Sequence, residues 1–177
     1  MQHVSHRTIP VAIRSSAGWV TGRIHLDGGV SLLRHLNESG AFYRLTDVTL
    51  PGEKNTRPFF AMHVRETAFV VPLDCEERKA AKEFPNETFR HEVACLLPEG
   101  PMFCSFEILA GIRVSDYLMN HPNFIPVRRC WTPFRDLPES LADPVEFGFL
   151  NAARVVGVSE ADDGTVEERI GERVPVT

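Results

Sequence analysis

Seven histidines are the side chains with the most evident potential for chemistry, because imidazole is a common ligand of zinc and other transition metals. A metal site needs several ligands close together, usually at short and characteristic spacings. His25 and His35 are ten residues apart, on an expected strand and an expected helix, and no Asp or Glu joins them at ligand spacing. His63 belongs to another expected strand. We therefore expect neither a metal site nor a cofactor.

Nucleophilic catalysis would require a Ser or Cys on a strained turn beside a base. The chain has no Gly-x-Ser-x-Gly motif, and Ser31 and Ser115 have the positions of helix N-caps. The glycine pair Gly28-Gly29 is not followed by a helix that begins with Lys and Ser or Thr, so it predicts a turn rather than a phosphate-binding loop. We expect that the protein is not an enzyme.

Four cysteines, Cys75, Cys95, Cys104 and Cys130, are too few and too scattered for a disulfide scaffold in a chain of this length. Cys95 and Cys104 stand on either side of an expected turn, so they could face each other across a hairpin. Each also alternates in step with apolar neighbours, which is the pattern of reduced thiols packed in a core. The pattern leaves open whether Cys95 and Cys104 ever form a disulfide.

The distribution of charge argues against a large surface for nucleic acid. Of the 177 residues, 43% are hydrophobic and 24% charged, which is typical of a globular protein. Residues 1–72 have a net charge of +3, whereas residues 73–92, 93–158 and 159–177 have −2, −2 and −4. Phosphate binding needs clustered Lys and Arg. No apolar run approaches the roughly 20 residues of a membrane-spanning helix, and the first residues lack the apolar segment of a signal peptide, so we expect a cytoplasmic protein.

An internal repeat is the clearest organising feature of the sequence. Sliding the chain along itself until residues 18–48 fall on residues 100–130 aligns four identical pairs: Gly18 with Gly100, Gly29 with Gly111, Leu36 with Leu118, and Phe42 with Phe124. Apolar positions coincide as well. The loop that follows is longer in the second copy, so beyond this loop the offset of the alignment increases and Val64 aligns with Leu150. We therefore expect a tandem duplication, with one copy at residues 8–72 and the other at residues 93–158.

Each copy has the same expected order of elements. Two alternating strands joined by a glycine turn come first, followed by a short helix, a third strand, a polar proline-rich loop and a final hairpin. The pattern predicts a mainly β fold with short helices (β/α+β), in which each copy is a small bent sheet or open barrel of about five strands. Residues 73–92 are expected to form a charged connector that is helical at residues 76–84, and residues 159–177 an acidic flexible tail.

One segment of the second copy resembles a known family. Arg113-Val114-Ser115-Asp116-Tyr117-Leu118-Met119-Asn120, followed by Phe124-Ile125-Pro126-Val127, is similar to small uncharacterised bacterial domains with an Arg-Leu-Ser-Asp-x-Leu-Asn box. The first copy resembles the same family in Thr21-Gly22-Arg23-Ile24 but lacks the Arg and Ser-Asp of the box. The resemblance implies one small fold for both copies and no known activity, and a looser likeness to Sm-type small barrels is an analogy of fold.

Aromatic side chains are the best candidates for a binding surface. Seven aromatic side chains are more than so small a unit can bury on one face. Two of them are Phe60 and Phe134, and the other five are the ones that we expect to contact a partner: Trp19, Tyr43, Phe59, Phe103 and Trp131. Phe103 alternates with inward-facing Met102 and Cys104, and it shares its expected face with the polar Ser105. The alternative is that such residues pack between the two copies.

These patterns favour a non-enzymatic protein-protein interaction or scaffold module, with a protein partner or self-association and no membrane span. The alternative is a small-barrel protein that binds nucleic acid or nucleotides. That function is favoured by the positive charge of the first copy, to which Arg14, Arg23, Arg34 and Arg44 contribute.

Overall fold

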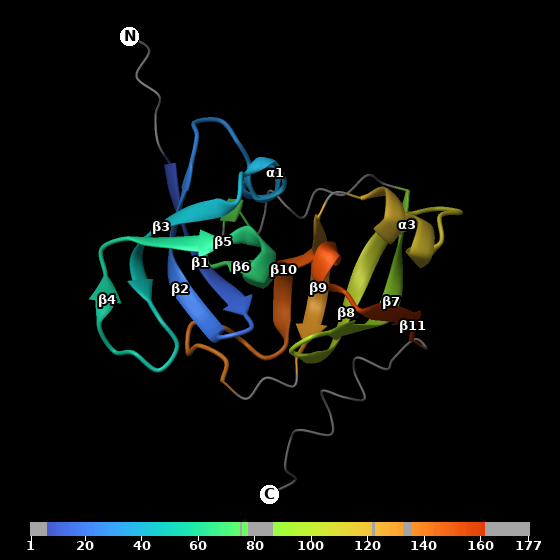
Figure 1. Cartoon of the computed structure of the whole chain (residues 1–177). Helices are drawn as coiled ribbons and strands as arrows, with labels where there is room; N and C mark the ends of the chain where they lie inside the picture. Colours follow the sequence, from blue (N-terminus) through green and yellow to red (C-terminus); the bar gives the residue numbers. More distant parts are fainter. Residues whose placement is uncertain (1–6, 75, 78–86, 122, 133–135, 162–177) are drawn as a thin grey trace, which may run out of the picture.

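The computed structural model describes residues 7–74, 76–77, 87–121, 123–132 and 136–161. In this part of the chain the fold is mainly β with short helices, which confirms the predicted fold class. The strands form one open antiparallel sheet of 11 strands and not a closed barrel (Figure 1). The two expected units are therefore parts of one continuous sheet.

The elements divide into two halves of the sheet. The first half contains β1 (Arg7–Ser15), β2 (Gly18–Leu26), α1 (Leu32–Glu38), β3 (Phe42–Thr49), β4 (Thr56–Arg57), β5 (Phe60–His63), the 3-10 turn η1 (Val64–Glu66) and β6 (Thr67–Pro72). The second half contains β7 (Thr88–Leu97), β8 (Gly100–Leu109), α3 (Val114–Asn120), β9 (Phe124–Trp131), β10 (Val145–Asn151), the 3-10 turn η2 (Ala152–Arg154) and β11 (Gly157–Glu160).

The order of strands is the same in both halves. Along the sheet it runs β11-β7-β8-β9-β10 and then β6-β1-β2-β3-β4, with β5 also paired to β3. β4 and β5 together thus take the place in the first half that β10 takes in the second. The registers agree as well, since Ser15 pairs with Gly18 in the first half and the residues aligned with them, Leu97 and Gly100, pair in the second.

The same backbone irregularity occurs in both halves. β2 and β3 pair through an irregularity next to Thr21, and β8 and β9 through one next to Phe103. At each irregularity one non-glycine residue has a positive φ: Asp47 of β3 at 52° and Arg129 of β9 at 49°. A β-bulge bends a strand and increases its twist, so both halves curve at the same place.

The predicted final hairpin is wrong in both halves. β5 pairs with β3, whereas β6 pairs with β1 and β10 on the opposite side of the first half. The chain turns between them through η1, where His63 Nδ1 accepts a hydrogen bond from the Arg65 N–H, and Asn151 caps η2 in the same way. Because His63 and Asn151 take equivalent places, the predicted alignment of Val64 with Leu150 is also wrong. A hairpin would have left one face of the apolar β6 exposed to water.

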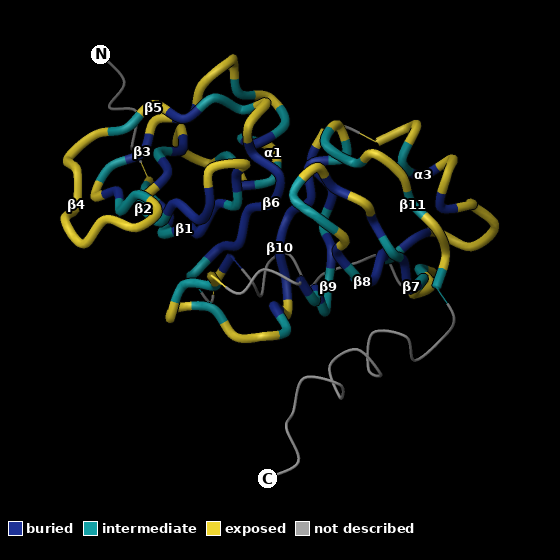
Figure 2. Tube along the Cα trace, turned by 60° about the horizontal axis from the view of Figure 1, so that its bottom comes forward, coloured by how far each residue is buried: buried dark blue, intermediate teal, exposed yellow. Residues whose placement is uncertain are grey.

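β6 lies between two hydrophobic cores, and all six of its residues are buried. Val70 belongs to the core of the first half, whereas Phe69 and Val71 belong to the core of the second half. In β10, Phe149 belongs to the first core and Leu150 to the second. The halves therefore share the side chains of their central strands, and Figure 2 shows β6 and β10 buried side by side.

The predicted N-caps agree with the structure in one half only. Ser31 caps α1 by accepting a hydrogen bond from the Arg34 N–H (3.3 Å), as predicted. Ser115 does not cap α3, because that helix begins at Val114 and its N-cap residue is Arg113. Arg113 is the residue that the repeat aligns with Ser31, so the helices start at equivalent positions although only one has a capping side chain.

The predicted connector and tail are both shorter than expected. Residues 88–92 belong to β7, where Arg90 stands opposite Glu107 of β8. Opposite charges at facing positions stabilise a pair of strands, so charged residues extend β7. Residues 159–160 likewise belong to β11. Of the predicted helix at residues 76–84, only residues 76 and 77 are within the described part of the chain, and residues 162–177 of the predicted tail lie outside it.

Candidate functional site

Two of the five aromatic residues predicted to contact a partner are core residues. Trp19 is 6% exposed and Tyr43 0%, so neither forms part of the surface. Trp19 packs edge-on against Phe69, with ring centroids 6.5 Å apart, because the second half covers this face of the first half. The Tyr43 hydroxyl donates to the Leu36 carbonyl of α1 (3.3 Å), and burial raises the pKa of Tyr43. The prediction is wrong for both residues.

Phe103 and Trp131 lie side by side on the second half. They face each other across β8 and β9 with ring centroids 5.5 Å apart, and both are partly buried. Ser105, the polar residue on the expected face of Phe103, is 0% exposed because it stands between Glu92 and Arg128, whose longer side chains flank it. This aromatic pair therefore offers less accessible surface than the alternation predicts.

Phe59 is the predicted contact residue that the structure exposes most, at 58%. Phe42 is 55% exposed and stands opposite His63 of β5, with ring centroids 4.8 Å apart. Phe60 is partly buried against the first core, and Phe134 lies outside the described residues. Two exposed phenylalanines, Phe42 and Phe59, therefore lie at the end of the sheet that β5 forms, whereas a third, Phe89, lies on β7 of the other half.

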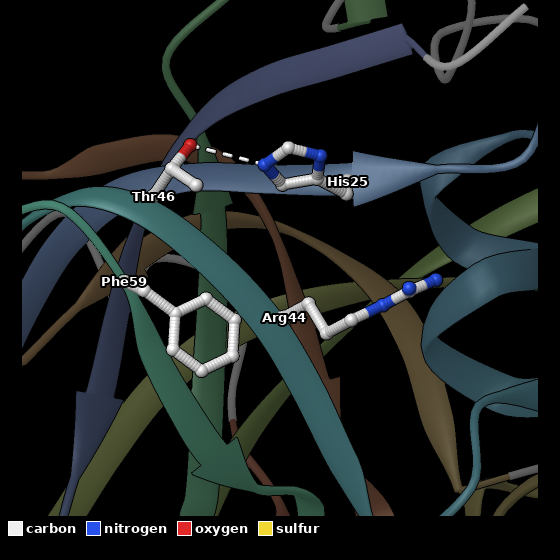
Figure 3. A pocket seen from close by; sticks show the side chains of 4 residues that line it. All are labelled: His25, Arg44, Thr46 and Phe59. Atoms are coloured by element: carbon white, nitrogen blue, oxygen red, sulfur yellow. Dashed lines mark hydrogen bonds between the residues drawn. The ribbon is translucent and has the colours of Figure 1, made fainter.

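A small hollow of about 220 Å³ lies beside Phe59. It is lined by His25 of β2, by Arg44 and Thr46 of β3, and by Phe59, which directly precedes β5 (Figure 3). His25 Nε2 and Thr46 Oγ1 share a hydrogen bond of 3.0 Å, which holds the imidazole in place. An aromatic ring beside an arginine is a combination enriched at protein interfaces.

A larger groove of about 500 Å³, which we call the β5 groove, runs beside the same strand. Its apolar walls are Val20, Phe42, Leu50, Phe60 and Met62. Val20 and Met62 belong to the first core, and Phe60 and Leu50 pack against it, so the groove opens onto the edge of that core. An apolar groove along a strand edge can bind an extended chain through its side chains and its backbone together.

The arginines that favour nucleic-acid binding are mostly engaged within the chain. Arg44 is exposed and lines both the small hollow and a polar hollow of about 320 Å³ next to α1. The other three contact polar groups of the protein: Arg14 with Asp136 (2.7 Å), Arg34 with Glu38 (2.9 Å) and Arg23 with Thr8 (3.0 Å). Of these four arginines, Arg44 is therefore the one that lies beside Phe59, and the four do not form a row.

Three thiols of the second half are hydrogen-bonded to one another in its core. Cys95, Cys104 and Cys130 are free and buried, and Cys104 bonds to both of the others. Hydrogen bonding to Cys104, together with burial, raises the pKa of Cys95, and burial raises the pKa of Cys104. Reactive cysteines need an accessible thiolate, so these thiols are inert packing groups. The prediction of reduced core thiols is confirmed for these three, and Cys75 lies outside the described residues.

Phe42 is a candidate contact residue that the sequence prediction missed. Its signal was the alternation of β3, where Tyr43 and Leu45 are buried and Phe42 and Arg44 are exposed. Placing the charged Arg44 on the outer face would have placed Phe42 there too, because residues two apart on a strand share a face.

Among the described residues, no group of three or more His, Cys, Asp or Glu side chains is arranged to hold a metal ion. The helices in the same part of the chain are all too short or too polar to cross a membrane. Comparison of the chain with protein-family models, with curated proteins and with solved structures finds no match.

Proposed function

We propose that this chain is a non-enzymatic protein-protein interaction module, built from a tandem duplication and acting in the cytoplasm. The common strand order, the common registers and the recurring bulge support the duplication. The resemblance of residues 113–127 to a family of small bacterial domains belongs to the same proposal.

The observation that carries the proposal is the edge of β5, which pairs with β3 alone among the described strands and has exposed Phe42 and Phe59 and an apolar groove beside it. Proteins usually shorten, charge or cover the strands at the ends of a sheet, because an open strand edge pairs with other chains. The opposite end of the sheet follows this rule, since β11 ends in the polar Ser159 and Glu160. β5 is as short as β11, with four residues, but three of them are the apolar Phe60, Ala61 and Met62. Exposed aromatic patches beside such an edge mark interaction sites.

Affinity purification from the native host tests this function with three forms of the chain: wild type, Phe59→Ser and Phe89→Ser. Phe89 is the matched control, because it is 60% exposed but stands on β7 in the other half. We expect a specific protein to be recovered with wild type and with Phe89→Ser, and about tenfold less of it with Phe59→Ser. A partner recovered equally with all three forms contradicts the proposal.

Binding of nucleic acid or nucleotides is the alternative for this surface, and Arg44 beside the ring of Phe59 is the observation that favours it. Bases stack on exposed aromatic rings, and a neighbouring arginine can contact a phosphate. Under the proposed function the chain passes a heparin column at about 0.15 M salt without retention. Retention that Arg44→Ser abolishes would favour the alternative.

A further inference from the structure

We propose that the β5 edge binds an extended apolar segment of a partner protein as an added antiparallel strand. One large apolar side chain of that segment, opposite Met62, fills the β5 groove. This inference rests on the proposed function and names the kind of partner that the edge takes. Its basis is the second half of the chain, where the equivalent edge is already covered.

β5 and β10 are equivalent strands. Phe42 pairs with His63 in the first half, and the residue aligned with it, Phe124, pairs with Asn151 in the second. Met62 therefore corresponds to Leu150, which stands at the same place in its ladder. Because the registers match, the way in which β10 is covered shows how β5 can be covered.

The outer edge of β10 is covered by β6. Phe69 stands opposite Leu150 in this antiparallel pair, and Val70 stands opposite Phe149. The Asn151 side-chain amide adds a hydrogen bond to the Thr67 carbonyl (2.8 Å). A strand of apolar residues, held by ladder pairing and by alternate side chains, is therefore what this kind of edge binds.

The β5 groove corresponds to a space that Phe69 helps to fill in the second half. Val20 and Met62 of the groove correspond to Met102 and Leu150, which belong to the same core cluster as Phe69. Since Phe69 stands opposite Leu150, a side chain opposite Met62 points toward the groove. In the described part of the chain, β5 pairs with β3 alone. One difference is that Phe60 stands where β10 has the bare backbone of Gly148, over which the ring of Phe69 lies. The incoming side chain must therefore enter the part of the groove beside Val20 and Met62 and pack against Phe60 as a wall.

The described strands of a second copy of this chain do not supply the required strand. β11 is the equivalent of β6, because it pairs with β7 in the register in which β6 pairs with β1. At the position of Phe69, however, β11 has Gly157, and at the position of Val71 it has Ser159. β6 itself is enclosed between β1 and β10. β5 of a second copy also has a free edge in the described part of the chain, but its Met62 is buried in its own core and its Phe60 packs against that core, so neither side chain is available for the groove of a neighbour. The described strands of a second copy thus do not supply the large side chain that the groove needs, which favours a different protein.

A synthetic peptide with the sequence of residues 65–72, Arg-Glu-Thr-Ala-Phe-Val-Val-Pro, provides a free strand of the required kind. We expect this peptide to bind the full-length chain in fluorescence anisotropy and to slow amide hydrogen exchange at residues 60–63. The same peptide with Gly in place of Phe, as in β11, should bind about tenfold more weakly. Phe42→Ser in the protein should weaken binding of the Phe peptide about fivefold, whereas Phe89→Ser should change it less than about twofold.

Several outcomes would overturn the inference. Equal affinity of the two peptides, absence of binding up to about 1 mM, or protection at other strands but not at residues 60–63 would each contradict it. Dimers of the wild type that dissociate in Phe42→Ser would assign the edge to a second copy and would also contradict it. If the peptide fails to bind while Phe59→Ser still loses a native partner, this inference alone is refuted. A native partner that Phe59→Ser does not affect refutes the proposed function instead.

Discussion

The ring of Phe69 lies against the bare backbone of Gly148, where the two halves of the sheet meet. A Cβ added at Gly148 would overlap the edge of that ring and would lie 3.0 Å from the Val70 carbonyl oxygen. Phe69 belongs to β6 and Gly148 to β10, the two central strands. The absence of a side chain at Gly148 therefore gives the Phe69 ring its place against β10, where the two central strands pair.

Gly148→Ala should lower the free energy of unfolding by about 1–3 kcal/mol, because the new methyl group displaces a buried ring that has no room to move. Urea unfolding followed by circular dichroism measures this change. Gly157→Ala is the control, since a Cβ at Gly157 meets nothing within 4 Å. Equal stabilities of the two variants would show that the junction adjusts to the methyl group without cost.

Asp47 should tolerate Gly but not Val. Its φ of 52° lies in the left-handed region, which Gly adopts freely and β-branched residues adopt poorly. Asp47 is exposed, so packing contributes little to the effect of either substitution. We expect Asp47→Gly to be neutral or stabilising by up to about 1 kcal/mol and Asp47→Val to be destabilising by about 1–2 kcal/mol. Thermal unfolding of both variants tests this, and a stable Asp47→Val would contradict the role of the bulge.

Asn37→Ala should destabilise the contact between α1 and β9. The Asn37 side chain donates to the Phe124 carbonyl (3.0 Å) and accepts from the Phe124 N–H (2.7 Å), so it links the two halves. Losing both bonds should cost about 1–3 kcal/mol in unfolding free energy. Asn120→Ala is the matched control, because Asn120 is exposed and its amide bonds to the Asp116 carbonyl within its own helix. Similar losses in the two variants would contradict the linking role.

Stability should fall as the pH decreases below about 6.5, in part through His35. Burial lowers the pKa of His35, Asp27 opposes this effect, and Arg44 reinforces it. The unfolded chain therefore binds a proton at His35 more readily than the folded chain, so acid favours unfolding. The stabilisation by neutral His35 is complete above the unfolded pKa of about 6.5 and is lost as the pH falls from there toward the lower folded pKa.

Urea unfolding at about pH 7.5 and pH 5.5 measures this loss, which should be smaller in His35→Gln. Part of the loss should persist in the variant, since burial also lowers the pKa of His121. An unchanged loss in His35→Gln would exclude His35 as its source.

Local alternation determined much of the fold by itself. The sequence pattern predicted an inward face for Met102 and Cys104, and the structure buries both. It also predicted the glycine turns and the cap at Ser31. These features depend on the pleat of one strand or the end of one helix, so neighbours along the chain are sufficient to define them.

Only the tertiary structure decided what covers each face and each edge. The apolar run of β6 fits a hairpin with β5 as well as a central strand, and the choice depends on β10, far along the chain. Trp19 is buried because the second half covers it, whereas Phe42 and Phe59 stay exposed beside the free side of β5. The physical reason is that alternation defines two faces of a strand, while burial depends on which distant segments pack against each face.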